Sequence, residues 1–218
     1  LKGFYWNSRG LSDLAKYPNI AEAIRNHNLD FVAVMEIGKR DMSKSNFARL
    51  SGGADFVWHC FPPRGRSGCI LLRINANVHD LNFVVEGEFY IKFHLYNKFD
   101  KFKWILKAVY GPAPEEFKSP FLSELVRAWQ QNPLPTFIGG DFNIMRSSKE
   151  KNSNKYSNRW PFLFNAVIDS FYLQEIDITG RQFAWANSLP QPTYKKLDRV
   201  LMTTEWEFKY PLVTVHAL

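Results

Sequence analysis

Several polar side chains of this sequence stand directly after short apolar runs, where they could act on a phosphate. Gly139-Gly140-Asp141-Phe142-Asn143 is the most informative of these segments. Asp141 and Asn143 are two residues apart, so on an extended backbone both side chains face one side while Phe142 faces the core. A carboxylate beside an amide suits a phosphate site, because the first activates water and the second donates to a phosphoryl oxygen. An Asp-capped turn after a strand explains the same residues equally well.

Four more polar residues occupy comparable positions at the ends of apolar runs. Glu36 could bind a hard cation, although a solvated carboxylate at a strand end is the simpler interpretation. Asn7 could bond a carboxylate or a phosphate, or cap the turn after it, and Tyr110 could offer its hydroxyl to a phosphate or only pack. Asp198 could instead pair with a basic neighbour. Strand ends converge on one rim of a sheet-based fold, so we expect these side chains to lie around one cleft.

A polar segment rich in positive charge follows Asn143. It holds a single acid, Glu150, against five basic residues, which are Arg146, Lys149, Lys151, Lys155 and Arg159. With two interleaved aromatic residues these charges suit contact with a nucleic-acid backbone, while a solvated loop is the commoner outcome for such a run. Arg64 and Arg66 could form a second positive lip.

The elements that must position these residues alternate between strands and helices. Apolar runs and alternating patterns predict strands over residues 3–6, 30–35, 55–61, 67–73, 88–96, 104–110, 136–138, 182–186 and 196–202. Helical spacing predicts helices over residues 19–27, 119–129 and 160–171, the second with Ser119 as its cap and Pro120 at its first position. This order predicts an α/β (α+β) fold in which two mostly antiparallel β-sheets pack face to face with helices outside.

The composition limits the class of protein. A chain of 218 residues with 45% hydrophobic and 22% charged residues excludes a disordered tail and fits one domain over residues 1–218. The net charge of +7 favours a polyanionic partner. No apolar run approaches the ~18–20 residues that a membrane span needs, so we expect no membrane association. Cys60 and Cys69 do not make a disulfide framework and predict a reducing compartment. The first residues already read as a strand and lack a Met, so the chain looks trimmed from something longer.

Six short motifs in a fixed order resemble the endonuclease/exonuclease/phosphatase superfamily, and most closely the endonuclease domain of plant LINE-type (non-LTR) retrotransposons. They are residues 6–11, 35–36, 66–68, 109–112, 140–143 and 197–199. The resemblance spans nearly the whole chain. It implies a four-layer α/β sandwich that hydrolyses a phosphodiester with a divalent cation, Mg²⁺ or alternatively Mn²⁺.

The resemblance also implies roles for the residues that match these motifs. Glu36 would bind the metal, and Asn7 would help to orient the metal and phosphate groups. Tyr110 and Asn143 would contact the scissile phosphate. DNA is the substrate that the resemblance implies, and the basic residues described above, including Arg64 and Arg66, are the candidates for contact with its backbone.

The remaining two candidates depend on a motif that this sequence does not contain. Asp141 would align or deprotonate the attacking water, and Asp198 would orient a general-base histidine. The family closes with a Ser-Asp-His triplet that supplies this histidine, whereas the sequence stops at Leu218, and its His216 follows Val215 rather than an acid. We therefore expect a domain truncated at its C-terminus and impaired, because losing an acid–base partner costs ~10²–10⁴-fold in rate.

The leading expectation is a DNA endonuclease of retrotransposon origin that is monomeric and has the reverse transcriptase domain of its parent element as a further partner. A nuclear location follows only from the family's role. Two alternatives stay open: a catalytically inactive remnant that binds DNA, and a phosphatase of the same superfamily acting on a lipid or inositol headgroup.

Overall fold

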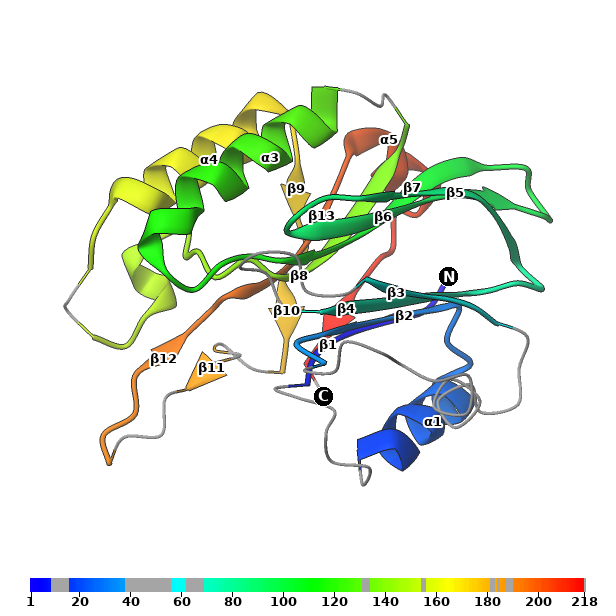
Figure 1. Ribbon diagram of the computed structural model, residues 1–218, viewed down its shortest axis with the longest axis horizontal. Coiled ribbons are helices and arrows are strands. Elements are labelled where there is room, and N and C mark those ends of the chain that lie inside the picture. The colour runs from blue at the N-terminus through cyan, green and yellow to red at the C-terminus, as the bar shows by residue number, and fades with distance from the viewer. Residues whose placement is uncertain are drawn as a thin grey trace. The chain divides into compact units, whose positions relative to one another are not determined.

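The chain separates into two compact units, residues 1–110 and residues 111–218. The computed structural model describes residues 1–8, 16–37, 56–61, 69–130, 134–153, 156–180, 183, 185–186 and 190–217. Both units mix strands with helices (Figure 1), which confirms the predicted α/β fold class. The prediction of a single domain stays a prediction.

The first unit is built mainly of strands. Its described elements are β1 (Gly3–Asn7), α1 (Lys16–His27), β2 (Phe31–Met35), β3 (Phe56–Phe61), β4 (Ile70–Asn75), β5 (His79–Glu86), β6 (Tyr90–Asn97) and β7 (Lys103–Tyr110). The first four strands form a sheet in the order β1-β2-β4-β3, with β1 and β2 parallel and the other neighbours antiparallel. β5, β6 and β7 pair antiparallel.

These two groups of strands pack face to face, as the sequence pattern predicts. β4 contacts β5, β6 and β7, and β2 contacts β7. The continuous apolar run of β2 is buried along its whole length. On its outer side Val32 and Val34 pack against Ile20 and Ile24 of α1. A strand covered on both faces needs apolar residues at every position, which explains why this run shows no alternation.

The second unit holds more helix and several short strands. Its described elements are η1 (Glu115–Phe117), α3 (Lys118–Gln130), β8 (Thr136–Asp141), η2 (Ser148–Glu150), α4 (Arg159–Ser170), β9 (Gln174–Glu175), β10 (Ile178–Thr179), β11 (Trp185–Ala186), β12 (Tyr194–Lys195), β13 (Asp198–Met202), α5 (Thr204–Lys209) and β14 (Val215–His216). β8, β13 and β9 form an antiparallel sheet in that order. β10 pairs parallel with β14, and β11 pairs antiparallel with β12.

Aromatic side chains fill the space on both faces of the β8 strand. On one face Phe142, directly after the strand, contacts Phe121 of α3 and Phe164 of α4, with ring centroids 6.4 and 5.3 Å apart. On the other face Phe137 stacks on Trp206 of α5 at 4.3 Å. Figure 1 shows α3 and α4 lying side by side. The predicted inward orientation of Phe142 is confirmed, since it is 1% exposed.

Several predicted boundaries need correction. Helix α3 begins at Lys118 because the 3₁₀ turn η1 leads straight into it, so Ser119 and Pro120 lie inside its first turn, where a proline is tolerated. β5 was not predicted, because a bulge between Leu81 and Phe83 breaks its alternation. α5 was not predicted either, since six residues show no helical period. In the described part of the chain, no helix has the length and apolar character required to span a bilayer.

Candidate active site

Two candidate residues of the first unit lie at the ends of neighbouring parallel strands. Asn7 is the last residue of β1 and pairs in register with Met35, the last residue of β2. Glu36 follows immediately, so the two candidates share one edge of the sheet. Glu36 has a φ of 58°. That left-handed conformation turns the chain away from the strand and is uncommon for a residue with a long side chain.

A serine between these candidates holds the turn. Ser8 is 3% exposed, and its hydroxyl donates toward the carbonyl oxygens of Met35 at 3.0 Å and of Glu36 at 3.2 Å. Its backbone N–H also donates to the Met35 carbonyl at 3.0 Å. One buried side chain thus satisfies both carbonyls at the point where the backbone leaves the sheet, and it fixes the position of Glu36.

Asn7 lies on the face of β1 that is turned toward β7. The Tyr5 hydroxyl donates to the carbonyl oxygen of Lys107 in β7 at 3.4 Å. Because successive side chains of a strand alternate between faces, Asn7, two residues on, shares the face of Tyr5. The amide is therefore aimed into the space between the packed sheets of this unit.

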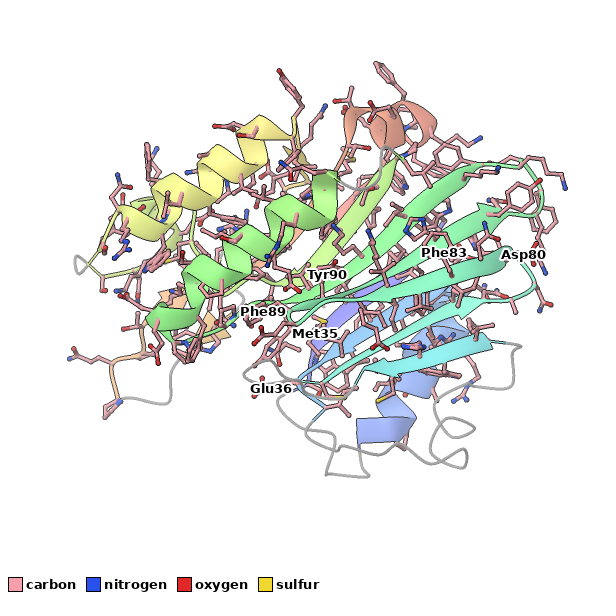
Figure 2. The ribbon with its side chains drawn as sticks, turned by 45° about the horizontal axis from the view of Figure 1, so that its top comes forward. Met35, Glu36, Asp80, Phe83, Phe89 and Tyr90 are labelled. Atoms are coloured by element: carbon pink, nitrogen blue, oxygen red, sulfur yellow. The ribbon has the colours of Figure 1, made fainter. Side chains whose placement is uncertain are left out.

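Tyr110 ends β7 at the same end of the unit. Its backbone N–H donates to the carbonyl oxygen of Phe89 at 2.9 Å. Figure 2 shows Phe89 and Glu36 at the same end of the two packed sheets. The first unit therefore gathers Asn7, Glu36 and Tyr110, which are far apart in the sequence, toward one end.

The second unit places two carboxylates side by side. In the antiparallel pairing of β8 and β13, Asp198 stands directly opposite Asp141. Residues opposite each other share one face of a sheet, with Cβ atoms about 4.5–5.5 Å apart, and two negative charges there repel. Asp141 is 4% exposed. Asp198 is half-buried, so the pair is partly shielded from water and is a favourable place for a cation or for strong hydrogen-bond donors.

Asn143 is fixed against this pair by its backbone and its side chain. It has a φ of 51°, so it is not extended, which corrects the expectation of simple alternation with Asp141. The left-handed turn lets its backbone N–H donate to Asp141 Oδ1 at 2.9 Å, while its Nδ2 donates to the Gly111 carbonyl at 2.8 Å. Asparagine tolerates this conformation better than most residues.

The backbone of Gly111 passes very close to the backbone of Asp141 and Phe142 in the second unit. Its N–H donates to the carbonyl oxygen of Asp141 at 2.7 Å. A Cβ at this position would come within 2.3 Å of the Phe142 carbonyl oxygen. Only glycine fits, which gives the sequence Tyr110-Gly111 a structural reason.

The predicted nucleic-acid contacts fall into different environments. Arg64, Arg66 and Lys155 lie outside the described residues. Lys149 and Arg159 are exposed, and the guanidinium carbon of Arg159 is 4.7 Å from the centroid of the adjoining Trp160 ring.

Arg146 is instead tied into the second unit. Its Nε donates to Asn165 Oδ1 at 2.7 Å, and its Nη1 pairs with Glu175 Oε2 at 2.8 Å. This guanidinium already has protein partners, so its role in phosphate contact stays a prediction.

Lys151 joins a basic and aromatic hairpin that the sequence pattern did not reveal. It forms a β-bridge with Lys195 of β12. The ammonium of Lys195 lies 5.0 Å from the centre of the Trp185 ring in β11. Burial and the charge of Lys151 lower the pKa of Lys195. The aromatic residues Trp185 and Tyr194 and the adjacent Lys195 were the sequence signal from which this cluster could have been predicted.

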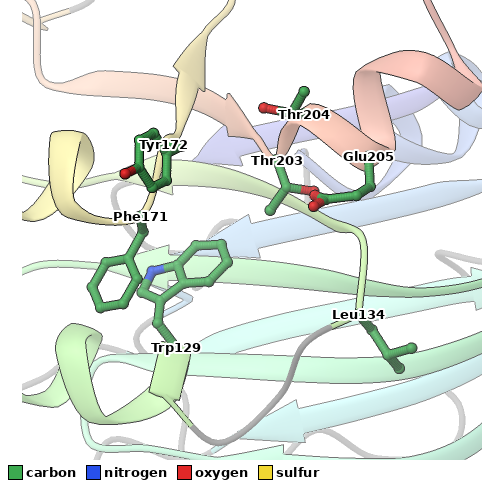
Figure 3. Close-up of a pocket in the computed structure, with 7 residues that line it drawn as sticks. All are labelled: Trp129, Leu134, Phe171, Tyr172, Thr203, Thr204 and Glu205. Atoms are coloured by element: carbon green, nitrogen blue, oxygen red, sulfur yellow. The ribbon is translucent and has the colours of Figure 1, made fainter.

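The second unit also contains a hollow, which Figure 3 shows with its lining residues. It is lined by Trp129, Leu134, Phe171, Tyr172, Thr203, Thr204 and Glu205. The Thr203 N–H donates to the Thr136 carbonyl at the start of β8, whereas Asp141 ends that strand. Of the lining residues that the structure describes, Glu205 alone carries a charge, and a negative charge does not favour phosphate binding. Among the described residues, no three His, Cys, Asp or Glu side chains cluster closely enough to hold a metal ion.

Solved structures of two kinds share this α/β fold. The chain is similar to the 3′ phosphatase NExo from Neisseria bound to a product DNA hairpin, at 14% identity and a TM-score of 0.69, over 92% of this chain and 86% of that one. It is similar to the endonuclease domain of TRAS1, a telomere-specific non-LTR retrotransposon, at 10% identity and a TM-score of 0.65, over 93% and 84%. A mannosyl-6-phosphatase from Bacteroides thetaiotaomicron matches at 14% identity and a TM-score of 0.62, over 94% and 85%. Identities this low show the fold alone.

The sequence itself assigns the family. The model of the Endonuclease/Exonuclease/phosphatase family matches residues 4–218. The chain therefore belongs to this family, whose members hydrolyse phosphodiester or phosphate bonds and usually use divalent metals. A search of curated proteins finds no match. The predicted superfamily is confirmed, and the closeness to plant LINE elements stays a prediction.

Proposed function

We propose that this chain is a metal-dependent DNA endonuclease of retrotransposon origin, acting in the nucleus. The observation that carries the proposal is the register of β8 and β13, which sets Asp198 opposite Asp141 while Asn143 is bonded to the same carboxylate. An acid that can accept a proton and an amide that can donate to a phosphoryl oxygen are groups that assist the hydrolysis of a phosphodiester.

The second unit offers both a proton acceptor and a hydrogen-bond donor for a phosphate. Asp141 aligns or deprotonates the attacking water. Asp198 is the residue that would orient a general-base histidine, although residues 1–218 contain no Ser-Asp-His triplet to supply one. Asn143 Nδ2 uses one hydrogen on the Gly111 carbonyl, and an amide nitrogen carries two, so the other can donate to a phosphoryl oxygen. The donor is already held in place, so little ordering is needed when the phosphate arrives.

The first unit contributes oxygen donors of the type that hard cations prefer. In the proposal Glu36 is the metal ligand, Asn7 orients the metal and phosphate groups, and Tyr110 contacts the scissile phosphate. Carboxylate and amide oxygens suit Mg²⁺ or Mn²⁺ rather than a soft metal. These side chains would hold a divalent ion, which would supply Lewis-acid stabilisation of a phosphoryl oxygen.

Nicking of supercoiled plasmid tests the proposal. With Mg²⁺ the chain should convert supercoiled DNA to the open circle, and chelation should stop the reaction. Asp141→Asn preserves the shape of the side chain and should lower the rate by ~10²–10⁴-fold. Asp169→Asn, a change at an exposed position of α4, is the matched control and should retain the wild-type rate.

Other outcomes separate the competing functions. Absence of nicking with either Mg²⁺ or Mn²⁺ contradicts the endonuclease. Release of phosphate from a monoester without nicking would identify a phosphatase. Binding of DNA with no hydrolysis of either substrate would identify a binding remnant.

Positive charge near the hairpin supports DNA as the substrate. The net charge is +7, and Lys151 adjoins Lys195 beside the aromatic ring of Trp185. Lys151→Gln should reduce the slope of log affinity against log salt by about 0.9, the value for one phosphate contact. Lys2→Gln, which removes an exposed charge just before β1, should leave the slope unchanged. An equal slope for both variants contradicts the contact.

A further inference from the structure

A buried ion network of the second unit surrounds one arginine. The Arg199 side chain is fully buried. Its Nη1 donates to Glu150 Oε1 at 3.0 Å and to Glu175 Oε1 at 2.8 Å, and its Nη2 also bonds Glu150 Oε2. A buried guanidinium needs such partners, since an unpaired charge in the interior is strongly destabilising. Two carboxylates held by one planar fork is a geometry that lysine does not reproduce.

The network continues outward from Glu175. Arg146 Nη1 lies 2.8 Å from Glu175 Oε2, and Lys196 Nζ lies 2.8 Å from Glu175 Oε1. Burial alone raises the pKa of Glu175, but the charge of Arg199 and the bonds from Lys196 and Arg146 hold that pKa below its usual value. The carboxylate therefore stays ionised and keeps its partners at neutral pH.

The same network holds the main chain on each side of the candidate residues. Arg199 Nη2 donates to the Ile144 carbonyl, next to Asn143, at 3.4 Å. The Lys196 N–H donates to the Glu150 carbonyl at 3.0 Å. In the same two segments, the Phe142 N–H donates to the Leu197 carbonyl, also at 3.0 Å. The segments 142–150 and 196–199 are thus joined by backbone bonds and by the arginine together.

Arg199 lies on the face of the sheet away from the acids. Arg199 stands opposite Gly140 in the ladder. Because successive residues of a strand alternate between its two faces, the Arg199 side chain points toward α4, while Asp141 and Asp198 lie on the opposite face. Its guanidinium carbon is 5.9 Å from the ring centre of Phe164 in α4. Gly140 has no side chain there, which leaves room for the long arginine.

We propose that Arg199 is a positioning residue for hydrolysis, which acts through the main chain to keep Asp198 opposite Asp141 and the Asn143 amide in place. Glu150 and Glu175 are its anchors. This inference rests on the proposed function and deepens it. A displacement of about 1 Å at a reacting group costs on the order of 10²-fold in rate, so small shifts of these segments are sufficient.

Arg199→Lys tests the proposal, because it keeps the charge and removes the fork. We expect kcat for plasmid nicking to fall about 10- to 100-fold with little change in KM, the sign of a defect in transition-state positioning. Arg127→Lys, at an exposed position of α3, is the matched control and should match the wild type. Glu175→Gln should lower kcat in the same direction, and the double variant should be no worse than the worse single one, because the residues act as one unit.

Amide hydrogen exchange over residues 142–150, read without substrate, separates this inference from the proposed function. Arg199→Lys should lose protection there whether or not the wild-type chain nicks DNA. Unchanged protection overturns the inference. Lost protection with an unchanged kcat also overturns it, since Arg199 would then be only structural. If Arg199→Lys fails to fold by circular dichroism, Glu175→Gln, which preserves side-chain shape, decides by the same two readouts.

Discussion

Each unit carries candidate acids at the ends of paired strands, which are β1 and β2 in the first unit and β8 and β13 in the second. The structure holds the acids of the two units in different ways. At the first, Glu36 sits on a left-handed turn whose carbonyls meet the hydroxyl of Ser8. At the second, Asp141 and Asp198 sit inside a ladder that a buried arginine network supports from behind.

The two halves are therefore suited to different tasks. A carboxylate on a short turn with one side-chain anchor can adjust to the coordination of a cation. Acids fixed in a ladder, with an amide bonded to one of them, suit proton transfer and phosphate contact, which depend on positions within fractions of an ångström. We therefore expect the second half to be the more sensitive to small structural changes.

Replacing one acid in each half gives the largest expected effects. Asp141→Asn should slow nicking by ~10²–10⁴-fold at any Mg²⁺ concentration, because it removes the group that acts on water. Glu36→Gln should instead raise the Mg²⁺ concentration for half-maximal nicking, by about 10–100-fold. Plasmid assays across a Mg²⁺ titration measure both. If excess Mg²⁺ rescues Asp141→Asn as well, the assigned division of roles is wrong.

Acid should weaken the first unit before the second. Burial lowers the pKa of His79 to about 4, and burial with two nearby lysines does the same to His94. The unfolded chain binds these protons near pH 6.5, so the first unit should lose about 3 kcal/mol per buried histidine as pH falls from 6.5 to 4. The lowered pKa of Glu175 stabilises the second unit above pH 4.5, and this contribution disappears only as pH falls below that value.

Amide exchange resolved by unit, and corrected for the intrinsic effect of pH, measures this order. His79→Leu should flatten the loss in the first unit. His27→Leu, on the exposed end of α1, should not. Simultaneous loss in both units near pH 6 contradicts the prediction.

Replacing one crowded glycine in each unit with alanine compares how much stability each unit loses when a Cβ is added. In Gly111→Ala the new Cβ meets the backbone oxygen of Phe142, and in Gly3→Ala it meets the ring end of Phe31. A ring can rotate away, whereas the Phe142 backbone is held by the bond from its N–H to the Leu197 carbonyl. We therefore expect losses of about 3 kcal/mol for Gly111→Ala and about 1 kcal/mol for Gly3→Ala. Denaturant unfolding measures both, and a larger loss for Gly3→Ala would contradict the reasoning.

Removing one hydroxyl from each unit should change the stability as little as Gly3→Ala does. Ser8→Ala and Thr203→Ala, the latter losing the cap that accepts the Trp206 N–H, should each cost about 1 kcal/mol. Ser8→Ala should also lower nicking, since the turn at Glu36 loses its anchor, whereas Thr203→Ala should not. Equal rates for the two variants would show that Ser8 only stabilises the fold.

Much of the fold could be predicted because it depends on local patterns. The apolar run over 30–35 and the alternation over 88–96 correspond to β2 and β6. β5 was missed because its bulge shifts the pattern by one residue between Leu81 and Phe83. α5 was missed because one cap and six residues leave no period to detect.

The candidate site was predictable in its acids and amides but not in what supports them. Asp141 and Glu36 stand at strand ends that the pattern already marks. Ser8 and Arg199 gain their roles from partners 27 and 49 residues away in the chain, Met35 and Glu150, which no local pattern connects. The left-handed turn at Asn143 likewise depends on a bond back to the Asp141 side chain.

The glycine across from Arg199 has a consequence for how this stretch changes over evolutionary time. Gly140 has no side chain on the α4 side of the ladder, and the buried Arg199 side chain opposite fills the space that a larger residue at position 140 would need. The two sites should therefore covary: descendants that acquire bulk at 140 should carry a shorter, uncharged residue at 199 and should lose the acidic partners at 150 and 175 together.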